Sequence, residues 1–584
     1  MKLQERLRAA FSKALPEANV DASVRPCADP KFGDFQCISV MPLAKTLKAN
    51  PRQLATAVSE VLEVDDLCDS VEVAGPGFLN FRVKAEAMEA VCREAARGEH
   101  LFFGKTSNPR TIVVDFSSPN VAKPMHVGHI RSTILGDCLA RLFRLQGHRV
   151  VTDNHIGDWG TQFGMLLVGW KQHLDEGALE SDPIGELERI YKLVNVACKE
   201  DPAVLDRARA ELVKLQAADD ENLGIWKKMI DLSKVQFETI YRRLGVTFDE
   251  TLGESFYNGR LGEVVSDLAG GGIARESEGA MCVFSDRQLP EKEDPFLIHR
   301  DGEWRDSPVL VQKNDGGFNY ATTDLATLQY RLETWDPAEV IYVTDGRQQL
   351  HFRQIFNVFA RWKPGTQSKL AHVWFGSILG DDGKPFKTRS GETVKLADLL
   401  NEAEERARRI VDEKNPELDE ETKAEIARVV GLGAVKYADL LPNRQSDYVF
   451  SWDKMLSLQG NTAPYLQYAF TRIRSIFRKA AADGAEARLD PAALKLVHED
   501  ELGLASKLME FGIVLNLVGE DYRPNLLCNY LFELAGSFSR FFEHCPVLKA
   551  SPEERASRLV LCDLTARVLS QGLDVLGIGV TDVM

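Results

Sequence analysis

One stretch of this sequence, from Thr111 to His129, constrains the fold more than any other. The apolar run 111–114 predicts a buried strand. The residues after it are rich in Ser, Pro and Asn, which is typical of a loop. From Gly128 onward, apolar residues recur at helical spacing. The stretch therefore predicts a strand that leads through a loop into the first turn of a helix.

Two histidines, His126 and His129, lie at that predicted helix start. A helix N-terminus has free N–H groups and the positive end of the helix dipole, and both favour anions. Gly128 lets a ligand approach the backbone. Two imidazoles three residues apart share a helix face and can donate to phosphate oxygens. The residues alone leave open a second interpretation, in which both histidines are only polar helix caps.

Composition sets broad limits on the class of protein. A chain of 584 residues is expected to form three or four domains. We find no apolar run that approaches the roughly 20 residues of a membrane span. Ten cysteines without a C-x-x-C pair argue against a zinc site and a disulfide framework, and they fit a cytoplasmic protein. The net charge of −16 favours an acidic enzyme, so any RNA contact must use local basic and aromatic surfaces.

Alternating strand and helix patterns predict an α/β fold with a doubly wound parallel, Rossmann-type sheet over residues 108–400. A second strand is expected at 148–153. The sheet is expected to resume at 318–324 and 340–345. The polar, mostly charged region between these parts predicts an inserted subdomain at about 171–300. A solvated helical pair within 186–244 and short antiparallel strands within 270–311 are expected to form it.

Three further units flank this predicted sheet. The first contains a helical segment at 42–61 and two strands, 71–73 and 78–83, around a Gly-Pro-Gly turn. The last has few Gly or Pro residues and mixes aromatic residues with arginines. The expected units are an N-terminal α+β domain (1–107), a helical connecting region (401–454) and a C-terminal α-helical bundle (455–584).

Residues 117–137 read S-S-P-N-V-A-K-P-M-H-V-G-H-I-R-S-T-I-L-G-D. This run resembles the HIGH signature of class I aminoacyl-tRNA synthetases, and in its full length that of bacterial-type arginyl-tRNA synthetases. The likeness extends to G-D-W-G-T-Q-F-G at 157–164 and, in the N-terminal unit, to F-G-D-F-Q at 32–36 and G-P-G-F-L-N-F at 75–81. The C-terminal unit resembles the anticodon-binding domain of this group.

The resemblance implies an arginine–tRNA ligase. Such an enzyme converts L-arginine and ATP to arginyl-adenylate and pyrophosphate, then transfers arginine to the terminal ribose hydroxyl of an arginine-accepting tRNA. ATP and the Mg²⁺ that it carries are the expected cofactors, without zinc or another protein-bound metal. The chain is expected to act as a cytoplasmic monomer without membrane contact.

The resemblance also implies which residues act on ATP. The implied catalytic residues are Lys123, His126, His129, Lys387 and Arg389. The implied ATP-binding residues are Pro119, Lys123, His126, Gly128, His129 and Lys384. The loop 381–391 occupies the position of the K-M-S-K-S loop of the class in a degenerate form, and Lys123 is implied to supply the missing ammonium. Which loop cation reaches the phosphates stays open, and a solvated surface loop is the alternative interpretation.

The same resemblance implies residues for the other two substrates. Those for arginine are Asp115, Asn120, Tyr320, Asp324 and Gln348. A guanidinium pairs best with carboxylates, but Asp115 as a loop cap and Asp324 as a helix N-cap are alternatives. The implied tRNA-binding residues are Phe32, Phe35, Arg472, Tyr530 and Met584. Their aromatic rings suit base stacking, although a core role is the usual one for an aromatic stripe on a helix.

Two rival functions remain at this point. The chain could be another class I enzyme, either a synthetase for a different amino acid or a small nucleotidyltransferase. It could also be a catalytically silent relative that only binds tRNA. The presence of Lys123, His126 and His129 speaks against a silent protein, and the large C-terminal helical unit speaks against a small nucleotidyltransferase.

Overall fold

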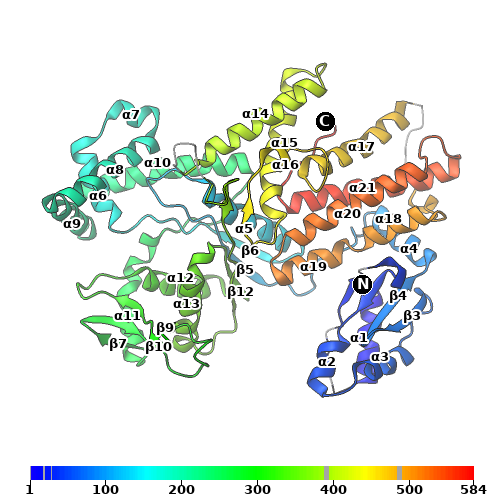
Figure 1. Ribbon diagram of the computed structural model, residues 1–584, viewed down its shortest axis with the longest axis horizontal. Coiled ribbons are helices and arrows are strands. Elements are labelled where there is room, and N and C mark those ends of the chain that lie inside the picture. Colours follow the sequence, from blue (N-terminus) through cyan, green and yellow to red (C-terminus); the bar gives the residue numbers. More distant parts are fainter. Residues whose placement is uncertain (1, 18–19, 21, 28, 387–392, 483–488) are drawn as a thin grey trace.

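A four-stranded parallel sheet in the order β13-β12-β5-β6 lies at the centre of the molecule (Figure 1). The computed structural model describes residues 2–17, 20, 22–27, 29–386, 393–482 and 489–584. The strands are β5 (Thr111–Asp115), β6 (Arg149–Asp153), β12 (Glu339–Tyr342) and β13 (Lys369–His372). Their register pairs Asp115 with both Asp153 and Tyr342, so the carboxyl ends of the strands share one edge.

Helices cover both faces of this sheet. Ile112 and Val114 of β5 pack into the core that contains helix α5 (Val127–Leu145). Val113, which points to the opposite face, packs into a second core with α12 (Tyr320–Trp335) and α13 (Gln349–Trp362). This alternation confirms the predicted Rossmann-type α/β fold and the predicted strand–loop–helix unit around the two histidines.

The prediction of a sheet strand at 318–324 is wrong, because these residues begin helix α12. The side chain of Asn319 caps the helix by accepting a hydrogen bond from the Tyr320 N–H. Thr322 donates its hydroxyl to the Val311 carbonyl. Two adjacent threonines favour a strand by local propensity. The cap and the burial of Leu325 and Leu328 beyond it outweigh that preference.

The predicted insertion has a helical part and a strand part. The helices are α6 (Gln162–His173), α7 (Glu176–Ser181), α8 (Pro183–Glu200), α9 (Pro202–Gln216) and α10 (Asp220–Leu244). The predicted helical pair within 186–244 is therefore wrong, since three helices occupy it. Asp201 separates two of them: its side chain accepts from the Ala203 N–H and caps α9, while Pro202 takes the first helical position.

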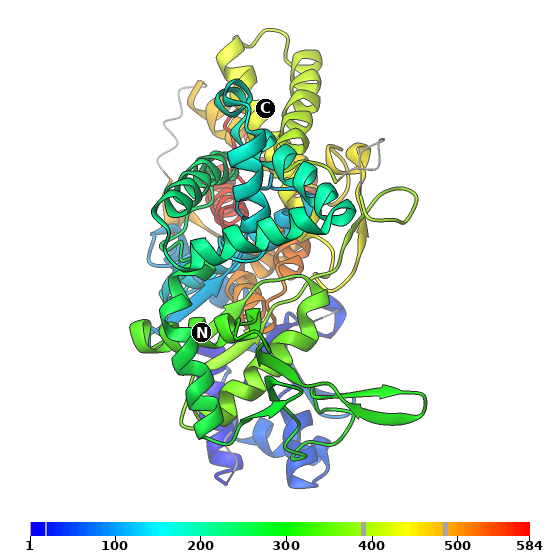
Figure 2. The ribbon, with the colours of Figure 1, turned by 90° about the vertical axis from the view of Figure 1, so that its left-hand side faces the viewer.

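The strand part confirms the predicted small antiparallel insertion. After η2 (Glu254–Arg260) and α11 (Leu261–Gly270), three strands form an antiparallel sheet in the order β11-β8-β7. Their bounds are β7 (Ala274–Ser277), β8 (Ala280–Val283) and β11 (Val309–Gln312). A separate hairpin of β9 (Leu297–Arg300) and β10 (Glu303–Asp306) projects from this region (Figure 2).

The N-terminal unit is an α+β domain, as predicted, with a four-stranded sheet in the order β1-β2-β4-β3. The elements are α1 (Lys2–Ala14), β1 (Val24–Pro26), η1 (Pro30–Phe32), β2 (Phe35–Cys37), α2 (Val40–Leu47), α3 (Pro51–Glu60), β3 (Cys68–Ala74), β4 (Phe78–Val83) and α4 (Ala85–Ala96). The two predicted strands are confirmed as β3 and β4. The single helical segment predicted at 42–61 is wrong. Asn50 caps α3 and Pro51 takes its first helical position, so the segment is divided into α2 and α3.

The remaining chain is mainly helical. After η3 (Gly346–Gln348), α13 and β14 (Ile378–Leu379) come α14 (Leu396–Lys414), α15 (Glu420–Leu440), β15 (Tyr448–Val449), α16 (Trp452–Met455), α17 (Ala463–Ala482), η4 (Pro491–Ala493), α18 (Glu499–Met509), α19 (Phe511–Asp521), α20 (Asn525–His544) and α21 (Pro552–Val575). A C-terminal helical bundle is thus confirmed. The domain boundaries proposed from the sequence stay predictions.

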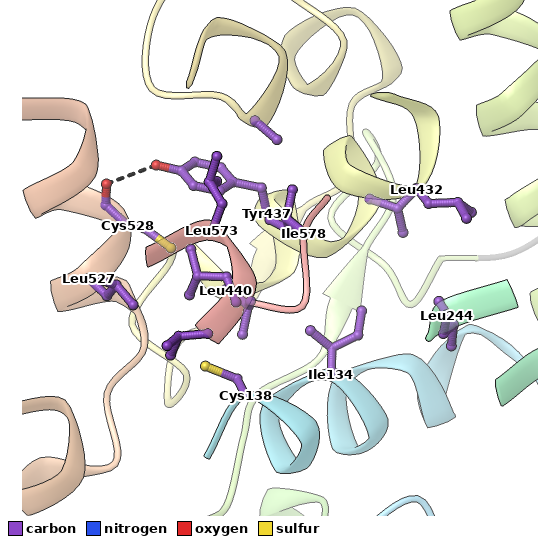
Figure 3. Packing of buried hydrophobic residues seen from close by; sticks show 14 of the residues in the cluster. Ile134, Cys138, Leu244, Leu432, Tyr437, Leu440, Leu527, Cys528, Leu573 and Ile578 are labelled. Atoms are coloured by element: carbon purple, nitrogen blue, oxygen red, sulfur yellow. Dashed lines mark hydrogen bonds between the residues drawn. The ribbon is translucent and has the colours of Figure 1, made fainter. Parts of the chain in front are cut away.

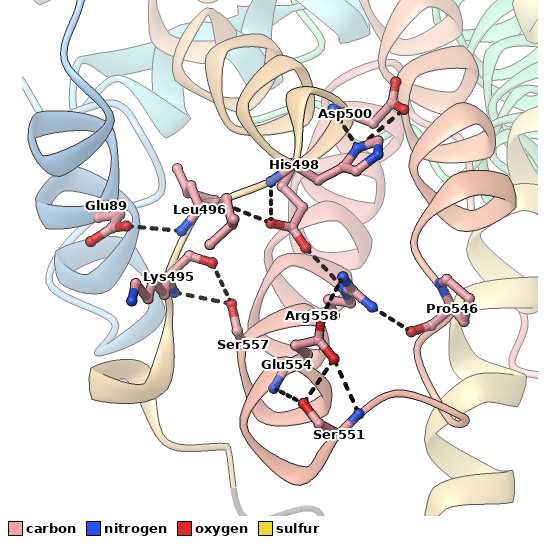
Figure 4. A network of polar contacts seen from close by, with 12 residues as sticks. Glu89, Lys495, Leu496, His498, Asp500, Pro546, Ser551, Glu554, Ser557 and Arg558 are labelled. Atoms are coloured by element: carbon pink, nitrogen blue, oxygen red, sulfur yellow. Dashed lines mark hydrogen bonds and ion pairs between the residues drawn. The ribbon is translucent and has the colours of Figure 1, made fainter.

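A polar network fastens α4 to this bundle (Figure 4). Glu89 accepts a hydrogen bond from the Leu496 N–H at 2.8 Å. Arg93 donates to the Leu494 carbonyl at 2.5 Å, and Arg567 of α21 donates to the Ala95 carbonyl in the last turn of α4 at 3.0 Å. The N-terminal domain is therefore joined to the C-terminal bundle by side-chain contacts across more than 400 residues of sequence.

One segment in the described part of the chain, 499–521, is long and apolar enough to cross a membrane. Half of its most apolar window is buried inside the protein, and the structure divides it into α18 and α19. Both features are usual for core helices of a bundle. Charged residues such as Glu501, Lys507 and Glu510 interrupt the segment, so it is not a continuous apolar run.

Candidate active site

The loop between β5 and α5 has an unusual backbone. Ser117, Ser118 and Ala122 all have positive φ angles, of 72°, 48° and 61°. Each such residue costs about 1 kcal/mol or more, because a Cβ crowds the left-handed conformation. Buried hydrogen bonds hold the loop in place: Ser132 accepts from the Ser117 N–H, and Ser233 of α10 accepts from the Ala122 N–H. The helical insertion therefore takes part in shaping this loop.

The two histidines at the start of α5 cap the helix with their Nδ1 atoms. His126 Nδ1 accepts from the Gly128 N–H at 3.0 Å, and His129 Nδ1 accepts from the His126 N–H at 3.1 Å. An Nδ1 atom that accepts a hydrogen bond carries no proton, so each ring is neutral with its proton on Nε2. In the described part of the chain, neither Nε2 atom has a hydrogen-bond partner. Both histidines therefore cap the helix, and the caps leave one N–H donor on each ring, so capping does not exclude a role toward a ligand.

Burial favours the neutral form of both rings. It lowers the pKa of His126, and the nearby Arg347 and Lys123 charges lower it further. Burial also lowers the pKa of His129 to about 3, with a further contribution from His126, whose ring centroid lies 4.0 Å away. Both imidazoles therefore remain uncharged donors throughout the neutral pH range.

Lys123 lies in the same loop, and its Nζ is 5.0 Å from the ring centre of Tyr191 on α8. Among the residues that the structure describes, no carboxylate pairs with this ammonium. A cation over an aromatic ring keeps its charge available to an anion. Pro119 is buried and Gly128 is exposed, so of these two only Gly128 offers its backbone to a ligand.

Residues 381–386, the first part of the 381–391 loop, lie in the described structure. Residues 378–386 form a short hairpin, with the Gly380 N–H donating to the Lys384 carbonyl and the Phe386 N–H to that of Ile378. Lys384 is exposed on it. Further along the chain, the Val127 N–H donates to the Val394 carbonyl at 3.0 Å. Residues 394 and 395 therefore lie beside the start of α5. Lys387 and Arg389, the other two predicted loop cations, lie outside the described residues.

A second group of predicted residues lies at the start of α12. Tyr320 is 61% exposed, and its ring centre is 4.8 Å from that of His351 on α13. Asp324 accepts a hydrogen bond from His351 Nε2 at 2.5 Å. Because Asn319 is the N-cap of this helix, the alternative role for Asp324 as that cap is wrong. Gln348 is exposed at the end of η3, three residues before His351.

Asn120 is exposed at the carboxyl edge of the sheet, in a space that Gly157 leaves for it. A Cβ at Gly157 would lie 2.2 Å from the Asn120 Oδ1 atom, and the Gly157 N–H donates to the Pro119 carbonyl. Gly157, at the start of the 157–164 loop, therefore packs against Asn120. The resemblance implies that Asn120 binds the amino group of arginine. That role of Asn120 stays a prediction.

Asp115 already has a guanidinium partner within the protein. Arg331 of α12 is fully buried and donates to both Asp115 and Asp153, each at 2.7 Å. Asp115 also accepts from the Ser118 hydroxyl at 3.0 Å. The loop-cap interpretation of Asp115 therefore agrees with its contacts. Its contact with substrate arginine stays a prediction, and Arg331 is a member of the site that sequence reasoning missed.

Glu254 is a second residue that the sequence did not indicate. Burial raises the pKa of its carboxyl to about 7, and the negative charges of Asp324 and Asp158 raise it further against the opposing effect of His155. The Glu254 N–H donates to the Ile156 carbonyl, which joins η2 to the loop beneath Asn120. Glu254 is thus a partly buried carboxyl group close to two other carboxyl groups, and such a group can bind a cationic side chain.

The predicted tRNA-binding residues differ in exposure. Phe32 is 53% exposed with Lys31 over its ring, and Arg472 is exposed over the ring of Phe542. Met584 is partly buried against the core. Phe35 and Tyr530 are only 4% and 3% exposed, so direct stacking of these two rings on a base is wrong. The family resemblance suggested exposed rings, but the fold packs both inward, Phe35 from β2 and Tyr530 from α20.

Comparison with known proteins agrees with this geometry. The family described as tRNA synthetases class I (R), catalytic domain, matches residues 95–452. The arginyl tRNA synthetase N terminal domain matches residues 1–83, and the DALR anticodon binding domain matches residues 466–584. The chain belongs to the arginyl-tRNA synthetase family. This membership confirms the family predicted from the 117–137 run.

Similar proteins span the whole chain. Arginine–tRNA ligases of a Synechococcus strain and of Proteus mirabilis are each 45% identical to it, covering 100% of this chain and 99% of their own. The arginyl-tRNA synthetase structure from Plasmodium falciparum has a TM-score of 0.81 at 28% identity and covers 100% of this chain and 98% of its own. The structure from Thermus thermophilus has the same TM-score at 25% identity, with 100% coverage of both.

Proposed function

We propose a residue-level mechanism for the arginine–tRNA ligase activity that belongs to this family of ATP-dependent ligases. A carboxylate oxygen of arginine attacks the α-phosphorus of ATP, and the bond to the β-phosphate breaks with loss of pyrophosphate. The terminal ribose hydroxyl of tRNA then attacks the carbonyl carbon of the adenylate, loses its proton, and AMP leaves. The first step needs two anions held in line and stabilisation of the charge that develops on phosphate.

One observation supports the assignment of the first step to the start of α5. Both histidines there are neutral, use Nδ1 for helix capping and keep an Nε2 donor. Fixed, uncharged donors at a helix N-terminus stabilise a developing negative charge without first having to lose or gain a proton. Lys123 adds a full positive charge. These groups act on ATP phosphates, and Mg²⁺ bound to ATP would neutralise further phosphate charge.

The described residues contain no group of three or more His, Cys, Asp or Glu placed to hold a metal ion. The residues at the start of α5 are instead hydrogen-bond donors and a cation, which suits an anion that brings its own metal. We therefore assign no protein ligand to Mg²⁺.

Arginine is placed at the start of α12. Asp324 lies close enough to Glu254 to raise its pKa, and Tyr320, on the same helix as Asp324, has an exposed ring beside His351, the partner of Asp324. Carboxylates bind a guanidinium by charge-assisted hydrogen bonds. Asn120 and Gln348, both exposed, are assigned to the amino group. ATP–pyrophosphate exchange, measured in the presence of tRNA with arginine, lysine or glutamine, tests this choice. Exchange should occur with arginine, and equal exchange with lysine would contradict the assignment.

Glu254 gives the arginine site a pH dependence. Its pKa of about 7 means that the carboxyl is protonated below pH 7 and charged above it. The charged form attracts a guanidinium, so KM for arginine is expected to fall about tenfold as pH rises from 6 to 8. Glu254→Gln should keep a high KM at both pH values. An unchanged pH profile in this variant would exclude Glu254 from arginine binding, and KM for ATP serves as the internal control.

The C-terminal residues are assigned to tRNA. Asp582 is held by Arg474 at 2.9 Å, and beyond it Val583 is 40% exposed. Removing Val583 and Met584 is expected to weaken tRNA binding about tenfold, because burying one apolar side chain in a contact contributes roughly 1.5–3 kcal/mol. The melting temperature should stay within a few degrees of that of the full chain. A lower melting temperature with normal tRNA affinity would instead give these residues a core role.

A further inference from the structure

Helices α10, α15, α20 and α21 and the C-terminal segment meet beside the middle of α5 (Figure 3). α5, α10, α15, α20, α21 and the chain after α21 each contribute apolar side chains. These include Ile134, Cys138, Leu244, Leu432, Tyr437, Leu440, Leu527, Cys528, Leu573 and Ile578. The place therefore joins the catalytic sheet, the helical insertion and the C-terminal bundle in one packed core.

A single ammonium group lies inside this junction. Lys436 of α15 is 4% exposed, and its Nζ donates to the carbonyl oxygens of Leu244 and Gly577, the latter at 2.5 Å. Leu244 is the last residue of α10, and Gly577 follows the end of α21. The carboxyl end of a helix carries partial negative charge on carbonyls without intrahelical partners. Lys436 thus binds the carboxyl-terminal regions of two helices at once.

Side chains of α5 complete the junction. Arg141 pairs with Asp137 at 2.7 Å and donates to the Gly245 carbonyl at 2.6 Å. A Cβ at Gly577 would lie 3.0 Å from the Asp137 carboxylate and 3.2 Å from Lys436 Nζ. Gly577 also has a φ of +69°, which glycine adopts without strain. The chain therefore turns away from α21 against both α5 and Lys436.

From Gly577 onward, the C-terminal segment runs along one face of α17. Gln467 donates to the Gly579 carbonyl and Thr471 to the Thr581 carbonyl, each at 2.8 Å. Arg474 pairs with the Asp582 side chain, and Arg478 donates to its carbonyl. These donors recur every three or four residues, which places them on the same side of the helix. The path of the segment is thus set by α17 along its length and by Lys436 at its beginning.

We propose that Lys436 is a positioning residue for tRNA aminoacylation, which fixes the C-terminal segment relative to the catalytic helix α5. The inference rests on the proposed contact of this segment with tRNA. α5 is one continuous helix that carries His126 and His129 at its start and Asp137 and Arg141 further along. The same helix therefore connects the junction to the site of adenylate formation.

Lys436→Met tests the role, because methionine keeps the apolar stem and removes the ammonium. We expect KM for tRNA to rise about tenfold, a usual size for coupling between two sites, with KM for ATP and arginine within about twofold of wild type. Lys423→Met is the matched control: Lys423 is also a buried lysine of α15, but it donates to the Pro416 carbonyl away from the junction. Equal effects of both variants on KM for tRNA would overturn the proposal.

The charge of Lys436 provides a second readout. Burial lowers the pKa of its ammonium to about 8, an effect that Asp137 opposes and that Arg141 and Arg428 strengthen. Cys138 of α5 also lies close enough to Lys436 to oppose the lowering of its pKa. Raising pH through 8 neutralises the group, so the difference in KM for tRNA between wild type and Lys436→Met should narrow between pH 7 and pH 9. A difference that stays constant over this range would contradict a role for the charge.

Gly577→Ala disturbs the same junction from its other side and remains informative if Lys436→Met folds poorly. Its effect and that of Lys436→Met should not multiply in the double variant, since both act on one contact. Fully multiplicative effects would overturn the proposal. Wild-type enzyme that failed to charge tRNA with arginine would remove the proposed function itself, whereas an active wild type with unaffected variants would remove only the role of Lys436.

Discussion

His129→Asn is expected to slow adenylate formation about 100- to 1,000-fold, the usual effect of removing one donor to a developing negative charge. The His129 Nδ1 atom accepts the His126 N–H, and the asparagine Oδ1 atom lies at a similar distance along the side chain. Asn therefore keeps the cap and removes the Nε2 donor. ATP–pyrophosphate exchange measures the rate, and direct tRNA binding should be nearly unchanged.

His129→Gln is the matched control for this prediction. Its amide nitrogen takes the place of Nε2, so part of the rate should return even though the cap contact is lost. Because the pKa of His129 is about 3, the wild-type rate should not follow titration of this ring between pH 6 and pH 8. A folded Asn variant with a normal exchange rate would show that the histidine serves the helix cap alone.

Asp324→Asn is expected to raise KM for arginine about 10- to 100-fold. The substitution keeps the shape of the side chain and an oxygen that can accept from His351 Nε2, but it removes the negative charge. Hydrogen bonds to charged groups contribute roughly 1.5–3 kcal/mol, which is the loss expected for the guanidinium. Steady-state kinetics with arginine and ATP varied separately would measure the effect.

His351→Gln tests the charge of Asp324 separately from its hydrogen bond with His351. Glutamine places an N–H donor near the position of His351 Nε2, so the carboxylate keeps a partner. KM for arginine should then rise only a few-fold. If KM for arginine stays normal in Asp324→Asn while KM for ATP rises, the carboxylate belongs to the nucleotide site and the present assignment of Asp324 fails.

The sequence determined the elements that depend on neighbouring residues. The apolar run 111–114, the loop after it and the helix from Val127 follow from local periodicity and loop chemistry, and they fix where His126 and His129 lie. The length and spacing of the 117–137 run also identified the family. These features are local because backbone geometry sets the side-chain period within a strand or a helix.

Local signals misled where two propensities competed. The threonine pair within 318–324 favours a strand, yet the Asn319 cap and the burial of Leu325 make the segment a helix. Similarly, Phe35 and Tyr530 have the composition of a base-stacking surface, but both are buried. The packing of the whole chain decides which side chains are exposed. The sequence of one helix or strand therefore does not show whether a neighbouring element will cover its aromatic side chains.

Only the tertiary structure decided which distant residues share a site. Glu254 comes close to Asp324 because η2 packs against α12, and Arg331 reaches Asp115 and Asp153 because the parallel strands end at one edge. Lys436 meets Leu244 and Gly577 across 192 and 141 residues of chain. No short sequence pattern predicts such contacts. Burial of apolar faces determines how the helices and the sheet pack, and that packing determines which charged groups lie close enough to pair.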